Sequence, residues 1–152
     1  MNQDLIKLFR SQLGNKHYNE LENTWLELLA SDLPFDELLK LAELAIRWAP
    51  AELASTLLWL LADSCAENRR FPERLIVLRR LVQLNPEDEK LPRVLTETLH
   101  SIYHNEPLLD RILQKSGLGY GEPIASALSK FDAYCQLLPG KMVYDPQRGT
   151  GT

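Results

Sequence analysis

The stretch that decides the fold is FPERLIVLRRLVQLNP, residues 71–86. Its apolar residues recur at helical spacing. Pro72 stands where a helix can begin without losing an internal hydrogen bond, and Asn85-Pro86 is a pair that ends one. The stretch therefore predicts a single helix from about 72 to 84.

Similar helix-starting and helix-ending residues divide most of the chain into helices. Apolar residues keep the helical period on both sides of the stretch, and a proline or a glycine falls near each break. We expect an all-α protein with eight helices, at about residues 2–13, 18–31, 36–48, 50–66, 72–84, 88–104, 107–117 and 123–138.

The first helices of successive pairs begin near residues 2, 36, 72 and 107, at intervals of 34, 36 and 35. A helix-turn-helix unit that repeats at about 34 residues is typical of tetratricopeptide arrays. Residues 78–87 also resemble the helix end and Asn-Pro turn of that family, although its small residues do not recur in register. Because each hairpin has an apolar stripe that it cannot cover alone, we expect residues 1–138 to form four stacked antiparallel hairpins in a right-handed α-α superhelix. The alternative is an irregular helical bundle with accidental spacing.

Composition and charge restrict the class of protein. The 152 residues are 45% hydrophobic and 25% charged, as in soluble globular domains, and the net charge of −4 disfavours nucleic acid as the main partner. No apolar run approaches the ~20 residues that span a bilayer, and the first residues lack the features of a secretory signal. Cys65 and Cys135 lack metal-binding spacing and favour two buried, reduced thiols over a disulfide. We expect a cytoplasmic protein that binds neither membrane nor nucleic acid.

Few residues suggest a catalytic, metal-binding or phosphate-binding site. His100 and His104 are four apart on one helical face, but no third metal ligand lies nearby in the sequence. Gly117, Gly119 and Gly121 follow a helix rather than a strand, so they favour a helix-helix connection over a phosphate-binding loop. We therefore expect no enzyme activity, no metal and no cofactor.

Three tryptophans, Trp25, Trp48 and Trp59, lie on apolar stripes. In a stacked helical protein such side chains pack between hairpins, and we expect all three in the core. The alternative is an aromatic cage for a cationic ligand.

Charge is divided unevenly within the helix pairs. The first helices carry nine Lys and Arg against six Asp and Glu, whereas the second helices, counted with the acidic residues just before them, carry three against eleven. The first helix of a stacked pair usually lines the concave side, so the pattern predicts a basic groove for an extended acidic peptide. The alternative is a scatter of charges that serves solubility. The candidate partner-binding residues are Lys40, Arg47, Arg74, Arg79 and Arg111.

Residues 139–152 break the helical pattern. The last helix should end at Pro139-Gly140. Strand propensity follows at residues 141–144, turn-forming residues at 145–149, and then two threonines. An isolated hairpin of this size is marginal in water. We therefore expect residues 139–152 to begin a β module that is incomplete in this chain.

The order Pro139-Gly140-x-x-Val143-Tyr144-x-x-x-x-Gly149-x-Gly151 resembles the opening of small β-barrel modules in several bacterial transcription factors. A helical, repeat-like region before such a module resembles the long forms of Gre-type transcript cleavage factors. The resemblance implies binding to bacterial RNA polymerase, whose secondary channel those factors enter with an acidic coiled-coil tip that helps to hold catalytic magnesium. Neither that tip nor the family's C-terminal domain is recognisable here, so no residue takes over a cleavage role.

Together these observations predict a non-catalytic protein-interaction module, the N-terminal accessory region of a transcription elongation factor that docks on polymerase or an associated protein. The alternative is a structural or oligomerisation domain of an unrelated cytosolic protein. The sequence leaves the oligomeric state open.

Overall fold

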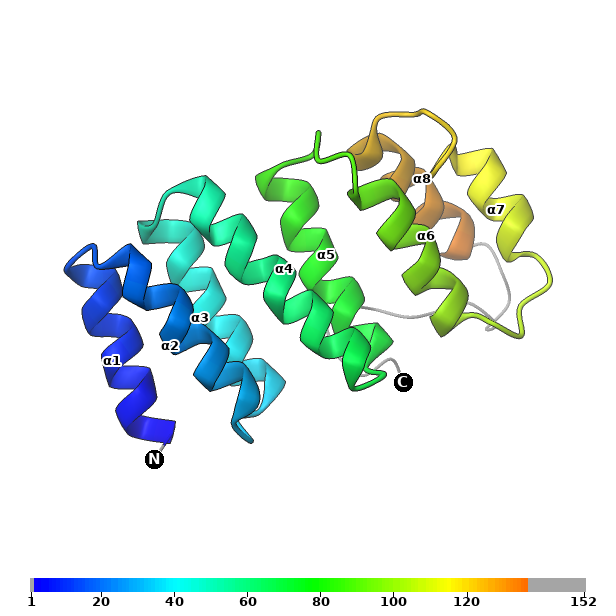
Figure 1. Cartoon of the computed structure of the whole chain (residues 1–152). Coiled ribbons are helices and arrows are strands. Elements are labelled where there is room, and N and C mark those ends of the chain that lie inside the picture. The colour runs from blue at the N-terminus through cyan, green and yellow to red at the C-terminus, as the bar shows by residue number, and fades with distance from the viewer. Residues whose placement is uncertain (1, 137–152) are drawn as a thin grey trace.

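The computed structural model describes residues 2–136, which contain eight α-helices and no strand (Figure 1). The expected all-α class is confirmed for these residues. The expected β segment at 139–152 lies outside them. The helices are α1 (Asn2–Gly14), α2 (Tyr18–Ala30), α3 (Phe35–Trp48), α4 (Ala51–Glu67), α5 (Phe71–Leu84), α6 (Leu91–Ile102), α7 (Leu109–Ser116) and α8 (Ile124–Gln136).

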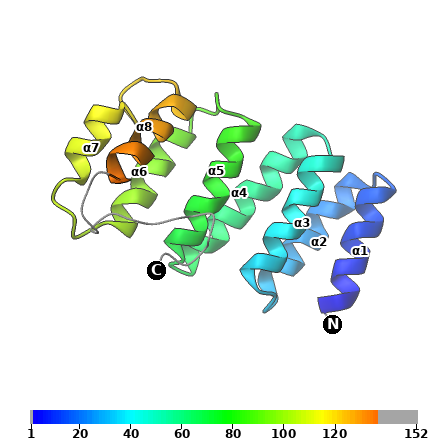
Figure 2. The same ribbon diagram turned by 180° about the vertical axis from the view of Figure 1, so that it is seen from behind.

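The helices form an elongated array that begins at α1 and ends at α7 (Figure 1). Each helix packs against its partner in the pairs α1–α2, α3–α4, α5–α6 and α7–α8, and the most extensive contact joins α4 to α5. Seen from behind, α1, α3, α5 and α8 lie in one layer in that order, with α2, α4 and α6 behind them (Figure 2). The fourth pair is therefore reversed, because α8 rather than α7 packs beside α5.

Two helix starts differ from the sequence prediction by more than one residue. α6 begins at Leu91 rather than near 88, and α7 at Leu109 rather than 107, so the first helices of the pairs begin at 2, 35, 71 and 109. Residues 85–90 form turns instead, because the Asp88 carboxylate accepts the backbone N–H of Lys90 at 3.0 Å and the indole N–H of Trp59 at 3.0 Å. The acidic run at 87–89 thus anchors a turn on α4 and does not form the first turn of a helix.

The buried tryptophan of α2 joins the first two pairs. Trp25 is 0% exposed, its indole N–H donates to the carbonyl oxygen of Leu57 on α4 at 2.9 Å, and its ring centroid lies 5.5 Å from that of Phe9 on α1. Beside it, the hydroxyl of Thr24 donates to Gln12 on α1 at 2.7 Å. Every polar atom in these contacts has a partner, as burial requires.

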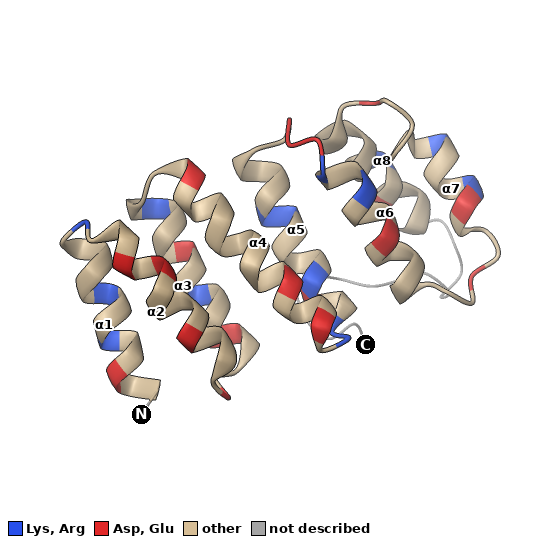
Figure 3. Ribbon diagram, in the orientation of Figure 1, with Lys and Arg blue, Asp and Glu red and all other residues tan. Residues whose placement is uncertain are grey.

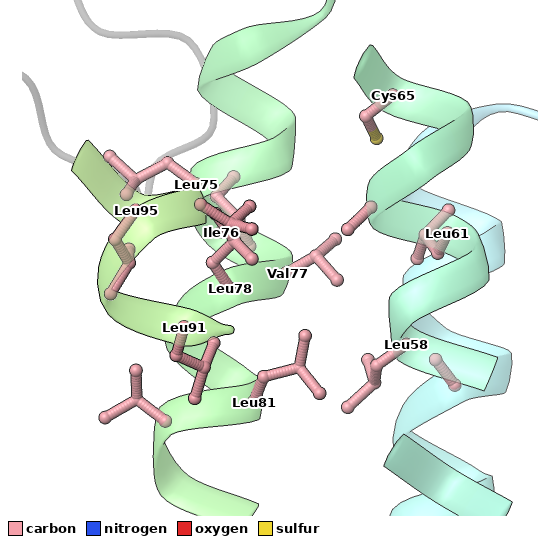
Figure 4. Packing of buried hydrophobic residues seen from close by; sticks show 14 of the residues in the cluster. Leu58, Leu61, Cys65, Leu75, Ile76, Val77, Leu78, Leu81, Leu91 and Leu95 are labelled. Atoms are coloured by element: carbon pink, nitrogen blue, oxygen red, sulfur yellow. The ribbon is translucent and has the colours of Figure 1, made fainter. Parts of the chain in front are cut away.

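The central helix α5 is apolar on two sides because it has helices on both. Val77 and Leu81 point toward Leu58 on α4, while Leu78 lies toward Leu91 on α6 (Figure 4). One contiguous set of buried apolar residues runs from α1 to α8. None of the helices between residues 2 and 136 combines the length and hydropathy needed to cross a bilayer.

The glycine-containing turn between α7 and α8 has the expected role. Gly117 has φ +81° and ends α7 in the left-handed conformation, with its N–H bonded to the carbonyl oxygen of Leu113 at 3.0 Å. A β-carbon on Gly117 would come within 2.8 Å of the β-carbon of Glu122. Glycine is required here both by the backbone and by the close approach of the chain.

Candidate functional site

Two of the predicted partner-binding residues share one exposed face of α3. Lys40 and Arg47 are seven positions apart, or about two helical turns, and both are exposed. Lys40 has a long contact of 3.9 Å with Glu37, whereas Arg47 has no hydrogen bond or ion pair with any part of the chain that the structure describes. The guanidinium of Arg47 is therefore available to a partner.

Arg79 has a partner within the chain. Its Nη1 and Nη2 donate to the two carboxylate oxygens of Asp132 on α8 at 2.9 and 2.7 Å, and the side chain is only 19% exposed. A two-point arginine–carboxylate pair of this kind is strong and directional. Arg79 therefore joins the last hairpin to α5.

Arg74 is also on α5, but it faces α4 and α6 rather than α8, and its side chain is 13% exposed. Its guanidinium lies 4.0 Å from the carboxylate of Asp63 on α4 and donates to the hydroxyl of Thr98 on α6 at 3.4 Å. Arg74 is thus packed between helices, and its burial leaves little of it for a partner.

The five candidate residues do not form one surface. Arg111 is exposed on α7, which is not the neighbour of α5 in the layer, and Arg80 of α5 pairs with Glu43 of α3 at 3.3 Å. Figure 3 shows acidic residues interspersed with the basic ones along α3. The structure thus brings together Lys40 and Arg47, and it separates Arg74, Arg79 and Arg111 from them.

Trp48 was expected in the core, and this prediction is wrong. Trp48 is 66% exposed, although it continues the apolar stripe of Leu41 and Ala45, which are buried. The stripe reaches the last residue of α3, and the chain then leaves the helix before α4 begins at Ala51. An exposed tryptophan therefore stands next to the unpaired Arg47. Sequence periodicity alone could not reveal this pair.

The other two tryptophans are buried to different extents, because Trp59 lies only partly buried at the edge of the core. Trp25 lies in the core as expected. Trp59 is half-buried, with its indole N–H bonded to Asp88 and the ammonium group of Lys90 4.6 Å from the centre of its ring. Lys90 thus occupies the ring face that an external cation would need.

His100 and His104, the two histidines that share a helical face, have contacts with oxygen atoms of the chain, and Nδ1 of His104 lies 3.3 Å from the carbonyl oxygen of Ser101. Nδ1 of His100 lies 2.8 Å from the carbonyl oxygen of Thr96, and Nε2 lies 2.8 Å from the carboxylate of Asp110 on α7. Both partners are acceptors, so both contacts are hydrogen bonds only when the imidazole carries a proton on each nitrogen. The hydrogen bond to Asp110 raises the pKa of His100 above its ordinary value. Within residues 2–136 no cluster of three or more His, Cys, Asp or Glu could hold a metal ion.

This arrangement predicts a pH-dependent link between α6 and α7. The pKa of His100 in the folded chain lies above the value of about 6.5 expected in an unfolded chain. The pair of His100 and Asp110 therefore contributes fully to the free energy of unfolding below pH 6.5. Its contribution is lost as the pH rises through the folded pKa. The pair is exposed, so its effect on stability should stay below about 1 kcal/mol.

An NMR titration of His100 measures this directly. We expect a midpoint above 6.5 in the wild type and a lower midpoint in Asp110→Asn, which keeps the size of the side chain but removes the charge. A wild-type midpoint at or below 6.5 would rule out the link.

Both cysteines are free and buried, as expected. Burial raises the pKa of Cys65 to about 12, with a further contribution from Glu73, and burial together with Asp132 raises the pKa of Cys135 to about 12. Neither thiol forms a thiolate near neutral pH, so neither has the character of a reactive cysteine.

No family model, curated protein or solved structure matches this chain. The resemblances to tetratricopeptide arrays and to Gre-type factors therefore remain predictions from the sequence.

Proposed function

We propose that this helical region is a non-catalytic protein-interaction module and that it binds its partner through the part of α3 between Lys40 and Trp48. The binding surface, here called the α3 patch, consists of Lys40, Arg47 and Trp48. The observation that carries the proposal is the 66% exposure of Trp48 next to an unpaired Arg47. Tryptophan and arginine are the residue types most enriched among those that dominate binding energy at protein interfaces.

Arg47, the unpaired cation of the α3 patch, favours an acidic group on the partner, although exposed carboxylates lie on the same helix at positions 36, 37 and 43. Opposite charge steers the encounter and suppresses wrong partners, while an exposed aromatic ring provides apolar area at small entropic cost. Arg74 and Arg79 are engaged within the chain, so the proposal rests on α3 and not on the wider groove predicted from the sequence.

The stacked-hairpin architecture is part of the same proposal. Pairwise packing of consecutive helices and helix pairs that begin 33 to 38 residues apart support a degenerate helical repeat, and such arrays commonly serve as binding platforms. The reversed last pair is a departure from that pattern.

The partner that the sequence suggests is bacterial RNA polymerase or a protein associated with it. Support comes from the resemblance of residues 139–151 to the start of a transcription-factor β module, with the helical region as an accessory domain. The cytoplasmic location belongs to the same proposal.

Charge reversal at the α3 patch tests the proposal. Arg47→Glu should reduce copurification of the partner from a bacterial lysate by at least about tenfold, because a desolvated charge pair becomes a repulsion. The melting temperature should not change, since Arg47 has no partner among the described residues.

Arg111→Glu is the matched control, because it makes the same charge change at an exposed site on α7. It should leave copurification intact. A partner that still copurifies with both Arg47→Glu and Trp48→Ala does not bind the α3 patch.

The alternative is an oligomerisation domain, which the exposed Trp48 would also serve. Light scattering separates the two. A dimer of the wild type that becomes a monomer in Trp48→Ala supports oligomerisation, and a monomer in both supports a separate partner.

A further inference from the structure

We propose that α2 and α4 form a second binding surface, which takes a basic amphipathic helix of another protein. The surface, here called the α2–α4 face, consists of Glu22 and Leu26 on α2 and of Leu53 and Leu60 on α4. It lies in the other helix layer from the α3 patch (Figures 1 and 2) and goes beyond the proposed function.

The edge of α2 that faces α4 is defined by hydrogen bonds. The indole N–H of Trp25 donates to the carbonyl oxygen of Leu57 on α4, whereas the hydroxyl of Thr24 donates to a side chain of α1. Successive helical residues are about 100° apart, so Leu26 lies past Trp25, on the outer side of the edge that faces α4. Glu22 is four positions before Leu26 and shares this edge.

Two leucines of α4 continue the apolar surface across the contact between the two helices. Leu53 and Leu60 lie four positions before and three positions after Leu57, so both are on the edge of α4 that faces α2. Leu26 is 46% exposed, and Leu53 and Leu60 are partly exposed at the edge of the core. The chain therefore leaves three neighbouring leucines incompletely covered.

The charge of these two helices is of one sign. Together α2 and α4 carry six carboxylates, and neither helix contains Lys, Arg or His, so both show only acidic bands in Figure 3. Glu20 contacts His17, and Asp63 contacts Arg74. The other four carboxylates form no hydrogen bond or ion pair with any residue in the described part of the chain: Glu22, Glu27, Glu52 and Glu67.

The cations around these helices lie away from the α2–α4 face. Lys16 is in the turn before α2, and Arg69 and Arg70 are in the turn after α4. Lys90 and Arg74 approach α4 from the side of α5 and α6, and α1 borders α2 on the opposite edge. The apolar surface is therefore bordered by carboxylates along most of its length.

This combination determines the kind of partner. Lys and Arg on a partner complement the carboxylates, whereas two copies of this chain that met through this face would oppose like charges. Nucleic acids and anionic membranes are repelled for the same reason. No strand among residues 2–136 offers an edge to an extended segment, and a helix satisfies its own backbone hydrogen bonds over an apolar surface. The occupant is therefore a basic helix with an apolar stripe.

The experiment uses the whole chain and two fluorescein-labelled peptides of about 15 residues, near the length at which isolated helices become stable. Both contain the same leucines, lysines and alanines, but only one places the leucines at helical spacing. Anisotropy is measured at about 150 mM salt, where the screening length is about 8 Å. We expect the amphipathic peptide to bind at least about tenfold more tightly than the scrambled one. Equal binding would overturn the role of the leucines.

Substitutions test the position of the site. Glu22→Lys and Leu26→Gln should each weaken binding of the amphipathic peptide about fivefold or more. The matched control is Glu27→Lys, which makes the same charge change three positions after Thr24, on the edge of α2 that faces α1. It should weaken binding by less than about twofold. Equal losses for Glu22→Lys and Glu27→Lys would overturn the α2–α4 face.

An NMR titration of the wild type with the amphipathic peptide needs no substitution. The backbone amide shifts should centre on Leu26, Leu53 and Leu60. Shifts centred on α3 would overturn the proposed site.

Arg47→Glu separates this inference from the proposed function. It should not weaken binding of the basic peptide, because it removes a cation from the other layer. If the basic peptide does not bind while Arg47→Glu still abolishes copurification, the α2–α4 face is wrong and the proposed function stands. If the peptide binds as described while Arg47→Glu leaves copurification intact, the reverse holds.

Discussion

Trp25→Ala should lower the free energy of unfolding by about 3–5 kcal/mol, the range for removing a large aromatic side chain from a packed core. Trp25 is fully buried, contacts Phe9 and donates to the carbonyl oxygen of Leu57, so its loss opens a cavity where α1, α2 and α4 meet. Urea denaturation followed by circular dichroism measures the change.

Trp48→Ala is the matched control for this prediction, since it removes the same side chain from an exposed site. We expect a change within about 0.5 kcal/mol. Should Trp25→Ala prevent folding altogether, Trp25→Phe should still fold with an intermediate loss of stability. Similar losses for the alanine variants at positions 25 and 48 would contradict the described core.

The second large effect is expected at the ion pair between α5 and α8. Asp132→Ala leaves the Arg79 guanidinium, whose Nε is already buried without a partner, lacking both of its carboxylate contacts. Because the pair is only partly buried, we expect a loss of about 1–3 kcal/mol, between the values for exposed and buried pairs. Chemical denaturation of the single and double alanine variants at Arg79 and Asp132 provides the coupling energy.

The control for this pair is Glu43→Ala, which breaks the more exposed, single contact with Arg80. Its effect should not exceed about 1 kcal/mol. A coupling energy near zero between Arg79 and Asp132 would contradict the stabilising role of this ion pair.

The helices could be predicted from the sequence because their limits depend on local chemistry. Proline at the start of α5 and glycine in the left-handed conformation after α7 act through the backbone of the neighbouring residues alone. The start of α6 could not be predicted this way. It depends on Asp88, whose partner Trp59 lies 29 residues earlier in the sequence.

The site was predictable only in part, for the same reason. That Lys40 and Arg47 share a face of α3 follows from helical spacing. The burial of Arg74 and the pairing of Arg79 depend on α6 and α8, and the order of the last pair has no local signal in the sequence. The exposure of Trp48 likewise depends on which helices lie nearby. The apolar stripe of α3 alone predicts that Trp48 is buried.

The proposed function uses only part of the charge pattern of the first helices. The basic residues of the first helices do not act as one group, because α5 uses its arginines to hold α3, α4, α6 and α8. Of the five candidate residues, Lys40, Arg47 and Arg111 stay exposed, and Arg47 is followed directly in the sequence by an exposed tryptophan.

Mapping the bound partner by NMR tests this account most directly. Titration of the labelled chain with the copurified partner should shift the Trp48 indole resonance and the backbone amides of the last two turns of α3, with little change on α2, α4 or α6. Shifts concentrated on those other helices, with the Trp48 resonance unmoved, would contradict the proposal that the α3 patch is the binding surface.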